Sequence, residues 1–193
     1  MRNRLEVRRL DLQPSHFFAS TNDGIRGQSI VVKRIKFITL GGTIAMIRDE
    51  HGHARPALDA EMLVAAVPGI TQVAQVDVET LMNVPSPYLT PRDMFRLSRH
   101  IADLASQGYY GVVITQGTDT LEETVYFLDL LVKEPISVIV TGAQRDPALL
   151  SADGPVNIME AIQVACDEAT PQLGAMVVFG SQVLAGSEVV KTH

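Results

Sequence analysis

The sequence predicts an α/β domain with an open, mostly parallel sheet flanked by helices, a Rossmann-like architecture of three layers. Segments with strand and helix patterns alternate five times from residue 34 onward. The middle strand segments are continuous apolar runs, as expected where helices cover both faces of a sheet. Polar groups follow the strand segments directly, and open α/β sheets bind ligands at that edge.

Strand patterns occupy residues 35–40, 73–80, 111–115, 136–140 and 173–179. The second of these segments alternates polar and apolar residues, whereas the third and fourth are apolar throughout. Right-handed crossovers between parallel strands then bring all their carboxyl ends to one edge of the sheet.

Helical spacing of apolar residues occupies residues 59–67, 91–107, 120–132 and 154–167. Thr90 and Pro91 suit the cap and first position of the second helix. Thr120 and Glu123 match a capping box at the start of the third helix. Pro155 suits the first turn of the fourth.

Composition indicates a soluble globular domain. The chain has 193 residues, of which 46% are hydrophobic and 20% charged. The net charge is −6, and the chain beyond residue 34 contains nine basic and nineteen acidic residues. An acidic body argues against nucleic-acid binding. No stretch approaches the roughly 20 apolar residues of a membrane helix.

Residues 1–32 differ from the rest of the chain. They are rich in arginine and loop-forming residues and lack the apolar stretch of a secretory signal. We expect a disordered or misassigned leader, followed by one domain over residues 33–193. Cys166 is the only cysteine, which excludes an intrachain disulfide and favours a reducing compartment. We expect it to be a small buried hydrophobe.

Five polar segments follow the five predicted strands, the last of them past a short loop, and four of the five carry a hydroxyl, a carboxylate or an amine. The segments are Gly41-Gly42-Thr43, Asn83-Val84-Pro85-Ser86, Gln116-Gly117-Thr118-Asp119-Thr120, Gly142-Ala143-Gln144-Arg145 and Lys191-Thr192. Convergence of separate segments on one edge is less easily produced by chance than one short motif. The sequence therefore predicts a site at this edge.

These residues could support acyl transfer. The hydroxyl of Thr43 could attack an acyl carbon if a base took its proton. Backbone N–H groups beside Gly42 and Gly117 could stabilise the resulting oxyanion. Lys191 could be the base if its surroundings lowered its pKa. Asp119 could orient the lysine or hold a substrate ammonium.

Each segment also has an ordinary structural interpretation. Gly42-Thr43 could be a turn with a cap, and Thr118-Asp119-Thr120 could be helix capping. Ser86, between two prolines, could be a loop serine, and Lys191 a solvated lysine. A histidine pair at His51 and His53 is too little to predict a metal site.

Four segments together resemble the bacterial-type L-asparaginase family, specifically its amino-terminal catalytic domain. They are Thr39-Leu40-Gly41-Gly42-Thr43-Ile44-Ala45, the run Ile114 to Thr124, Ser151-Ala152-Asp153-Gly154-Pro155-Val156-Asn157 and Val190-Lys191-Thr192. Their order and spacing fit the family from about residue 33 to the end.

The resemblance implies an amidohydrolase that converts L-asparagine to L-aspartate and ammonia. It implies that Thr43 is the nucleophile of an acyl-enzyme and that Thr118, Asp119 and Lys191 form a second catalytic group. Ser86 and Asp119 would hold the substrate's α-carboxylate and α-amino groups, with Gly42 and Gly117 lining the same site. The family needs no metal or organic cofactor and forms tetramers of intimate dimers. We expect a cytoplasmic location.

The sequence departs from the family in three places. The family has a tyrosine shortly after the nucleophile, whereas residues 48–58 contain none; His53 is an alternative base there. Tyr88 follows Ser86 where the family has polar and acidic residues, which leaves the choice between asparagine and glutamine open. The family's carboxy-terminal domain supplies dimer contacts and completes the neighbour's site. Without it, we expect lower stability and activity.

Two other functions are compatible with the same segments. One is the asparaginase-like subunit of a tRNA-dependent amidotransferase, although residues 1–32 are too short and polar for its extra domain. The other is a catalytically impaired fragment or a ligand-binding paralogue. A dinucleotide-binding protein fits poorly, because no G-x-G-x-x-G follows the first strand.

Overall fold

A computed structural model describes residues 5–6, 32–48, 54–56 and 58–191. Its main sheet has six strands in the order β5-β2-β6-β7-β8-β9. They are β2 (Arg34–Thr39), β5 (Gln75–Thr80), β6 (Gly111–Thr115), β7 (Ser137–Thr141), β8 (Ala175–Phe179) and β9 (Gln182–Ala185). The pairs from β5 to β8 are parallel, and β9 joins β8 antiparallel. The predicted fold class is confirmed.

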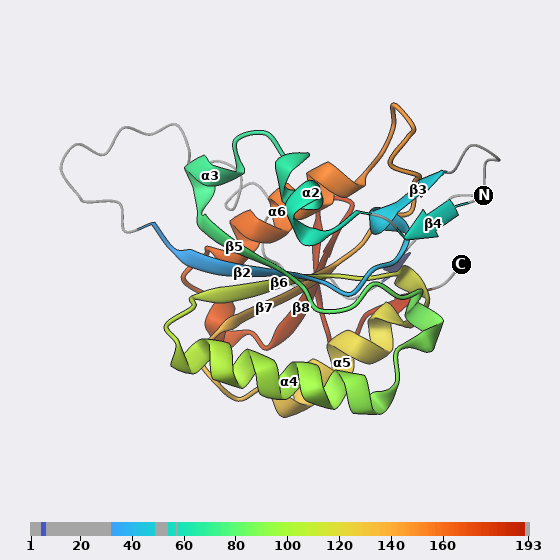
Figure 1. Cartoon of the computed structure of the whole chain (residues 1–193). Coiled ribbons are helices and arrows are strands. Elements are labelled where there is room, and N and C mark those ends of the chain that lie inside the picture. Colours follow the sequence, from blue (N-terminus) through green and yellow to red (C-terminus); the bar gives the residue numbers. More distant parts are fainter. Residues whose placement is uncertain (1–4, 7–31, 49–53, 57, 192–193) are drawn as a thin grey trace.

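Helices cover both faces of this sheet (Figure 1). One face carries α2 (Ala60–Ala65), α3 (Ile70–Val73) and α6 (Gly154–Ala165), and the other carries α4 (Pro91–Ser106) and α5 (Leu121–Leu131). The layers are therefore helix, sheet and helix.

Strand β2 shows how one sheet supplies two cores. Ile35 and Phe37 are fully buried in the cluster that includes α2 and α6. Ile38 and Leu40 belong to the cluster that includes α4 and α5. Because successive side chains of a strand point to opposite faces, a continuous apolar run fills both cores.

The edge strand β5 has no buried position, whereas β6 and β7 are buried at every position. This contrast explains the two strand patterns in the sequence. A strand with neighbours on both sides and helices on both faces needs apolar residues throughout, and an edge strand tolerates alternation.

Helix α4 begins as predicted, and helix α5 does not. The Thr90 side chain accepts the N–H of Asp93, whose carboxylate accepts the N–H of Thr90 in return. By contrast, Thr120 makes no side-chain cap for α5. Its hydroxyl donates to the Ser86 carbonyl oxygen at 2.9 Å. A tertiary partner has replaced the local capping box that the sequence predicted.

Several boundaries also differ from the predictions. Helix α3 occupies residues 70–73, where a strand was expected to begin at Val73, so β5 begins at Gln75. Helix α6 ends at Ala165, two residues early. Strand β9 was not predicted, because its four residues follow β8 after only Gly180 and Ser181.

Two small sheets were also missed. Strands β3 (Met46–Arg48) and β4 (Ala54–Pro56) form an antiparallel pair. Strand β1 (Leu5–Glu6) pairs antiparallel with β10 (Val190–Lys191), a contact that the leader hypothesis did not include. Within the described residues, no helix has the length and apolar character required to cross a membrane.

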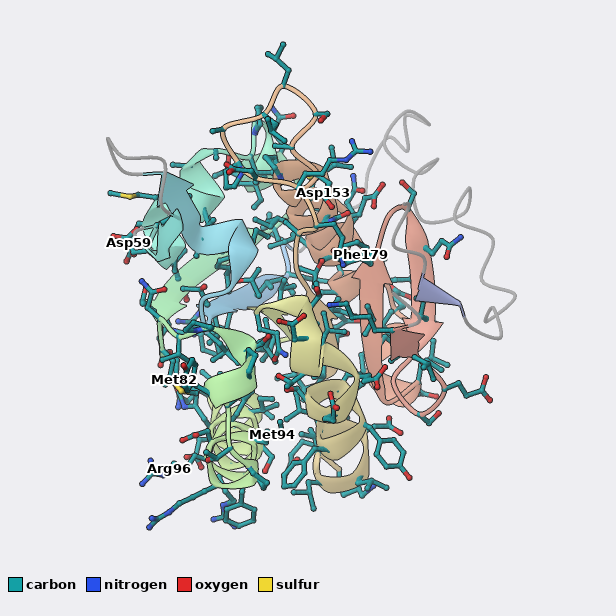
Figure 2. The ribbon with its side chains drawn as sticks, turned by 90° about the vertical axis from the view of Figure 1, so that its right-hand side faces the viewer. Asp59, Met82, Met94, Arg96, Asp153 and Phe179 are labelled. Atoms are coloured by element: carbon teal, nitrogen blue, oxygen red, sulfur yellow. The ribbon has the colours of Figure 1, made fainter. Side chains whose placement is uncertain are left out.

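The strand order creates a switch point. The chain leaves β2 to form β5 on one side and then returns to form β6 on the other. Ligands of open α/β sheets bind where the strand order reverses in this way, outside the carboxyl ends. The strands run toward the right of Figure 1, and Figure 2 views that side of the molecule.

Candidate active site

Glycine backbones hold the loops together at the switch point. Gly41 and Gly42 have φ angles of +106° and +88°, in the region that glycine favours. A Cβ atom on Gly42 would lie 2.1 Å from the amide nitrogen of Gly117, and one on Gly41 would lie 2.6 Å from that of Val84. The loops after β2, β5 and β6 therefore meet backbone to backbone.

Ser86 connects the loop after β5 to the loop after β6. It begins the 3-10 turn η2 (Ser86–Tyr88) and is 2% exposed. Its Oγ accepts the backbone N–H of Asp119 at 3.2 Å, and a Cβ atom on Gly117 would lie 2.7 Å from that oxygen. Ser86 is therefore buried in the contact between loops, unlike an ordinary solvated loop serine.

Lys191 lies against the loop after β6. Its Nζ donates to Thr118 Oγ1 at 3.1 Å and to Asp119 Oδ1 at 2.7 Å. The Lys191 side chain is 22% exposed, against 65% for Asp119. The backbone N–H of Lys191 also donates to the Glu122 carboxylate. Lys191 is thus a held side chain and does not fit the solvated-lysine interpretation.

The backbone places Thr43 at the same edge. The 3-10 turn η1 (Thr43–Ala45) starts directly after Gly42. The side chain of Thr43 lies outside the described residues, as do His51 and His53. The direction of the Thr43 hydroxyl therefore stays a prediction.

One contact of the site was not predicted. Gln144, in the loop after β7, donates from Nε2 to Thr118 Oγ1 at 3.2 Å. The sequence had indicated that this loop lies at the functional edge but had given its residues no role. The available signal was a long polar side chain two residues after Gly142, at a strand end.

The site also contains a buried amide at the end of β6. Gln116 is 1% exposed, and its Nε2 donates to the Gly117 carbonyl oxygen at 3.3 Å. Among the described residues its Oε1 has no hydrogen-bond partner. Buried amide oxygens are normally satisfied, so this atom is available to a bound water or ligand.

An apolar pocket lies beside the polar cluster, between α2, the start of α6 and the loop after β7. Its lining residues are Ile44, Leu58, Leu63, Ala66, Ala143, Arg145, Pro147, Gly154, Pro155 and Ile158. Apart from Arg145, these residues have no polar or ionisable group in their side chains. Amine, hydroxyl and carboxylate groups occur together only at the neighbouring cluster, within the described part of this edge.

Neither a metal-binding group nor the cysteine is part of the cluster that the described residues form. Within the described residues, no three histidine, cysteine, aspartate or glutamate side chains are grouped closely enough to hold a metal ion. Cys166 caps the carboxyl end of α6 and is only partly buried, so the prediction of a buried hydrophobe holds in part. Burial raises the pKa of its thiol to about 11, which disfavours the nucleophilic thiolate.

Fold and site define an α/β domain with a hydroxyl–amine–carboxylate cluster at its switch point. The model of the family described as "Asparaginase, N-terminal" matches residues 34–193, and the chain belongs to this family.

Known proteins agree with this assignment. The chain is 35% identical to the L-asparaginase of Bacillus licheniformis and 36% identical to L-asparaginase 2 of Escherichia coli. These matches cover 83% and 88% of this chain. A crystal structure of the probable cytoplasmic L-asparaginase of Campylobacter jejuni superposes with a TM-score of 0.79 at 38% identity, over 83% of this chain and 50% of that one. The chain spans about half the length of the curated relatives it matches.

Proposed function

We propose that the chain carries the catalytic site of an L-asparaginase-type amidohydrolase, which hydrolyses the side-chain amide of L-asparagine to L-aspartate and ammonia. The observation that supports this most is the contact of Lys191 with both Thr118 and Asp119 beside the Gly42–Gly117 junction. Lys191 lies 73 positions after Thr118 and 72 positions after Asp119 in the chain, so the fold brings distant residues together. The relatives named L-asparaginase agree with it.

In the proposed mechanism Thr43 is the nucleophile. Its oxygen attacks the carboxamide carbon and its proton passes to a base, while backbone N–H groups near Gly42 and Gly117 stabilise the oxyanion. The amide nitrogen takes a proton and leaves as ammonia, so that an ester joins the acyl group to Thr43. Water then attacks this ester, which releases aspartate and restores the threonine.

Thr118, Asp119 and Lys191 would move protons and orient the substrate. Lys191 and Thr118 share a hydrogen bond through which a proton could pass. The exposed Asp119 carboxylate suits an α-ammonium group. Ser86 Oγ accepts a hydrogen bond from the backbone N–H of Asp119 through one lone pair, and its hydroxyl can donate a hydrogen bond to an α-carboxylate.

Glutamine is the second candidate substrate. A glutaminase-asparaginase of Pseudomonas fluorescens biotype A is 35% identical over 79% of this chain. Tyr88, 74% exposed and two residues after Ser86, is the side chain we expect to set the preference. We further propose a cytoplasmic homo-oligomer that uses no cofactor and binds neither nucleic acid nor membranes.

Ammonia release tests the proposal. The purified chain is given L-asparagine or L-glutamine, beside a Thr43→Ala variant whose folding is verified by circular dichroism. Release that depends on Thr43 supports the enzyme, and the faster amide identifies its substrate. A folded chain without such release would instead favour a ligand-binding paralogue, an impaired fragment or an amidotransferase subunit.

A further inference from the structure

The segment Ser151–Asn157 matches the family, but the proposed mechanism gives it no role. Its carboxylate, Asp153, lies at the start of α6 (Figure 2). Asp153 makes no side-chain cap for its own helix. It accepts instead from the loop after β7, taking the N–H of Gln144 at Oδ2 and that of Arg145 at Oδ1, both at 3.0 Å.

Asn157, one turn later, holds the same loop at a second point. Its Nδ2 donates to the Gly142 carbonyl oxygen at 2.9 Å, and its Oδ1 accepts the N–H of Gly180 at 3.1 Å. It is 1% exposed. The loop after β7 is therefore fixed to the first turn of α6 at two points: at Gly142 by Asn157, and at Gln144 and Arg145 by Asp153.

This attachment directs the Gln144 side chain toward the cluster. Its Nε2 donates to Thr118 Oγ1 at 3.2 Å, and Lys191 Nζ donates to the same oxygen at 3.1 Å. A hydroxyl oxygen has two lone pairs and one proton. With both lone pairs engaged, Thr118 must direct its proton away from Gln144 and Lys191.

We infer that Gln144 is a positioning residue of the site, held by Asp153, which fixes the direction of the Thr118 hydroxyl proton. This inference deepens the proposed function and rests on it for its catalytic consequence. With Gln144 in place, Thr118 presents a proton to whatever occupies the site. Without Gln144 one lone pair is released and the hydroxyl can rotate, so a proton transfer through Thr118 loses its fixed geometry.

Nuclear magnetic resonance tests the contact without turnover. The side-chain amide pair that disappears in Gln144→Met belongs to Gln144. We expect Thr118→Val to shift this pair, Thr118→Ser to restore it, and Asp153→Ala to move it more than Asp153→Asn, which keeps one acceptor oxygen. The amide pair of the exposed Gln172 serves as the control, and Thr118→Ala is the second variant if Thr118→Val does not fold. If the Gln144 side-chain amide resonances do not shift in Thr118→Val, the inference is overturned.

Kinetics test the consequence once Thr43-dependent ammonia release has been established for the unmodified chain. We expect Gln144→Met to lower kcat about tenfold, the usual effect of one hydrogen bond, with KM changed less than twofold. Gln172→Met, at the opposite end of the sheet, should match the unmodified chain. Equal kcat values for the two methionine variants overturn the inference and leave the proposed function intact. If no Thr43-dependent ammonia release is found, the proposed function is wrong. The magnetic resonance comparison alone then tests the contact between Gln144 and Thr118.

Discussion

Two polar regions of this domain are assembled in different ways. One is the site at the carboxyl ends of the strands, where loops from distant parts of the chain meet. The other, which we call the charged flank, lies where β2 and β5 adjoin and consists of Arg34, Lys36, Asp77, Glu79, His100 and Tyr109. Both regions contain amine–carboxylate pairs at close distance. We expect the pair of the site to matter for catalysis and the pairs of the flank to matter for stability.

The charged flank comes from neighbouring strands and the elements that pack on them. Asp77 Oδ2 accepts from Arg34 Nε at 2.7 Å and from the Tyr109 hydroxyl at 2.8 Å. Glu79 lies 3.1 Å from both Lys36 Nζ and His100 Nε2. Lys36 and Asp77 stand opposite each other in the strand register. We therefore expect that each pair can be removed without a movement of the backbone.

The site depends instead on backbone contacts. The loop that carries Thr118, the partner of Lys191, is packed against the loops after β2 and β5 through Gly42, Gly117 and Ser86. The charged groups of the site are thus positioned by loops that pack closely at glycines. The charged groups of the flank are positioned by their contacts with one another. A comparison of variants in the two regions tests this difference.

We expect the largest effect from Gly42→Ala. Its Cβ atom would lie 2.1 Å from the Gly117 nitrogen at a φ of +88°, so a loop must move. We expect a loss of about 3 kcal/mol or more in the free energy of unfolding, measured by urea denaturation. Gly108→Ala is the matched control, because its φ is +82° with no atom within 4 Å; about 1 kcal/mol is expected there. Equal losses would mean that backbone conformation alone, and not the loop contact, requires glycine.

Lys191→Met and Lys36→Met should separate catalysis from stability. Both lysines pair with a carboxylate, but only Lys191 also donates to a hydroxyl of the proposed site. We expect Lys191→Met to lower kcat for ammonia release about 100-fold, and Lys36→Met to leave kcat within twofold. Steady-state kinetics on the two purified variants decides this. A similar loss in both would show that the flank and the site are coupled.

Tyr109→Phe should have a moderate effect on stability alone. Burial and the neighbouring Asp77 carboxylate raise the pKa of the Tyr109 hydroxyl, which is hydrogen-bonded to both Asp77 and Arg34. Removal of this hydroxyl should cost about 1 kcal/mol, because Asp77 is exposed enough to be rehydrated. Thermal unfolding measures the loss, with the exposed Tyr126→Phe as control. An unchanged midpoint for Tyr109→Phe would show that this hydroxyl adds nothing.

The smallest effect concerns Glu79 and pH. Partial burial raises the pKa of this carboxyl, but hydrogen bonds from Lys36 and His100 outweigh it, so the pKa lies below its ordinary value of 4.5. A lowered pKa in the folded state stabilises the fold above about pH 4.5, and this contribution is lost as the pH falls through the folded-state value. We expect about 0.5 kcal/mol, given the exposure of the pair. Unfolding of Glu79→Gln should therefore depend less on pH between 6 and 3, and an identical dependence would contradict this.

The sequence predicted the fold well where patterns were long and local. β6 was predicted residue for residue, because both of its faces are buried, and α4 began at its predicted cap. The failures came from tertiary contacts. Thr120 found a partner in Ser86 instead of capping α5, and the short strand β9 gave too few residues for a pattern.

The candidate site was predictable as a set of strand ends but not as a geometry. The polar residues after β2, β5 and β6 indicated the edge, because parallel strands end together. Nothing local distinguished Lys191 from a solvated lysine, since its partners lie more than 70 residues earlier. Gln144 was missed for a different reason, because its role depends on how Asp153 orients its loop and not on any local pattern.

The contact between Gly42 and Gly117 limits how this chain can change by mutation. A Cβ atom on Gly42 would collide with the backbone of Gly117, and one on Gly117 would lie 2.7 Å from Ser86 Oγ, so neither glycine accepts a side chain without a shift of its neighbours. A randomised library at these positions would return mostly unfolded variants. Diversity directed at the exposed side chain of Tyr88, or at the side chain of Gln144, whose attachment to Asp153 uses only its backbone N–H, would leave the scaffold intact and vary the site itself.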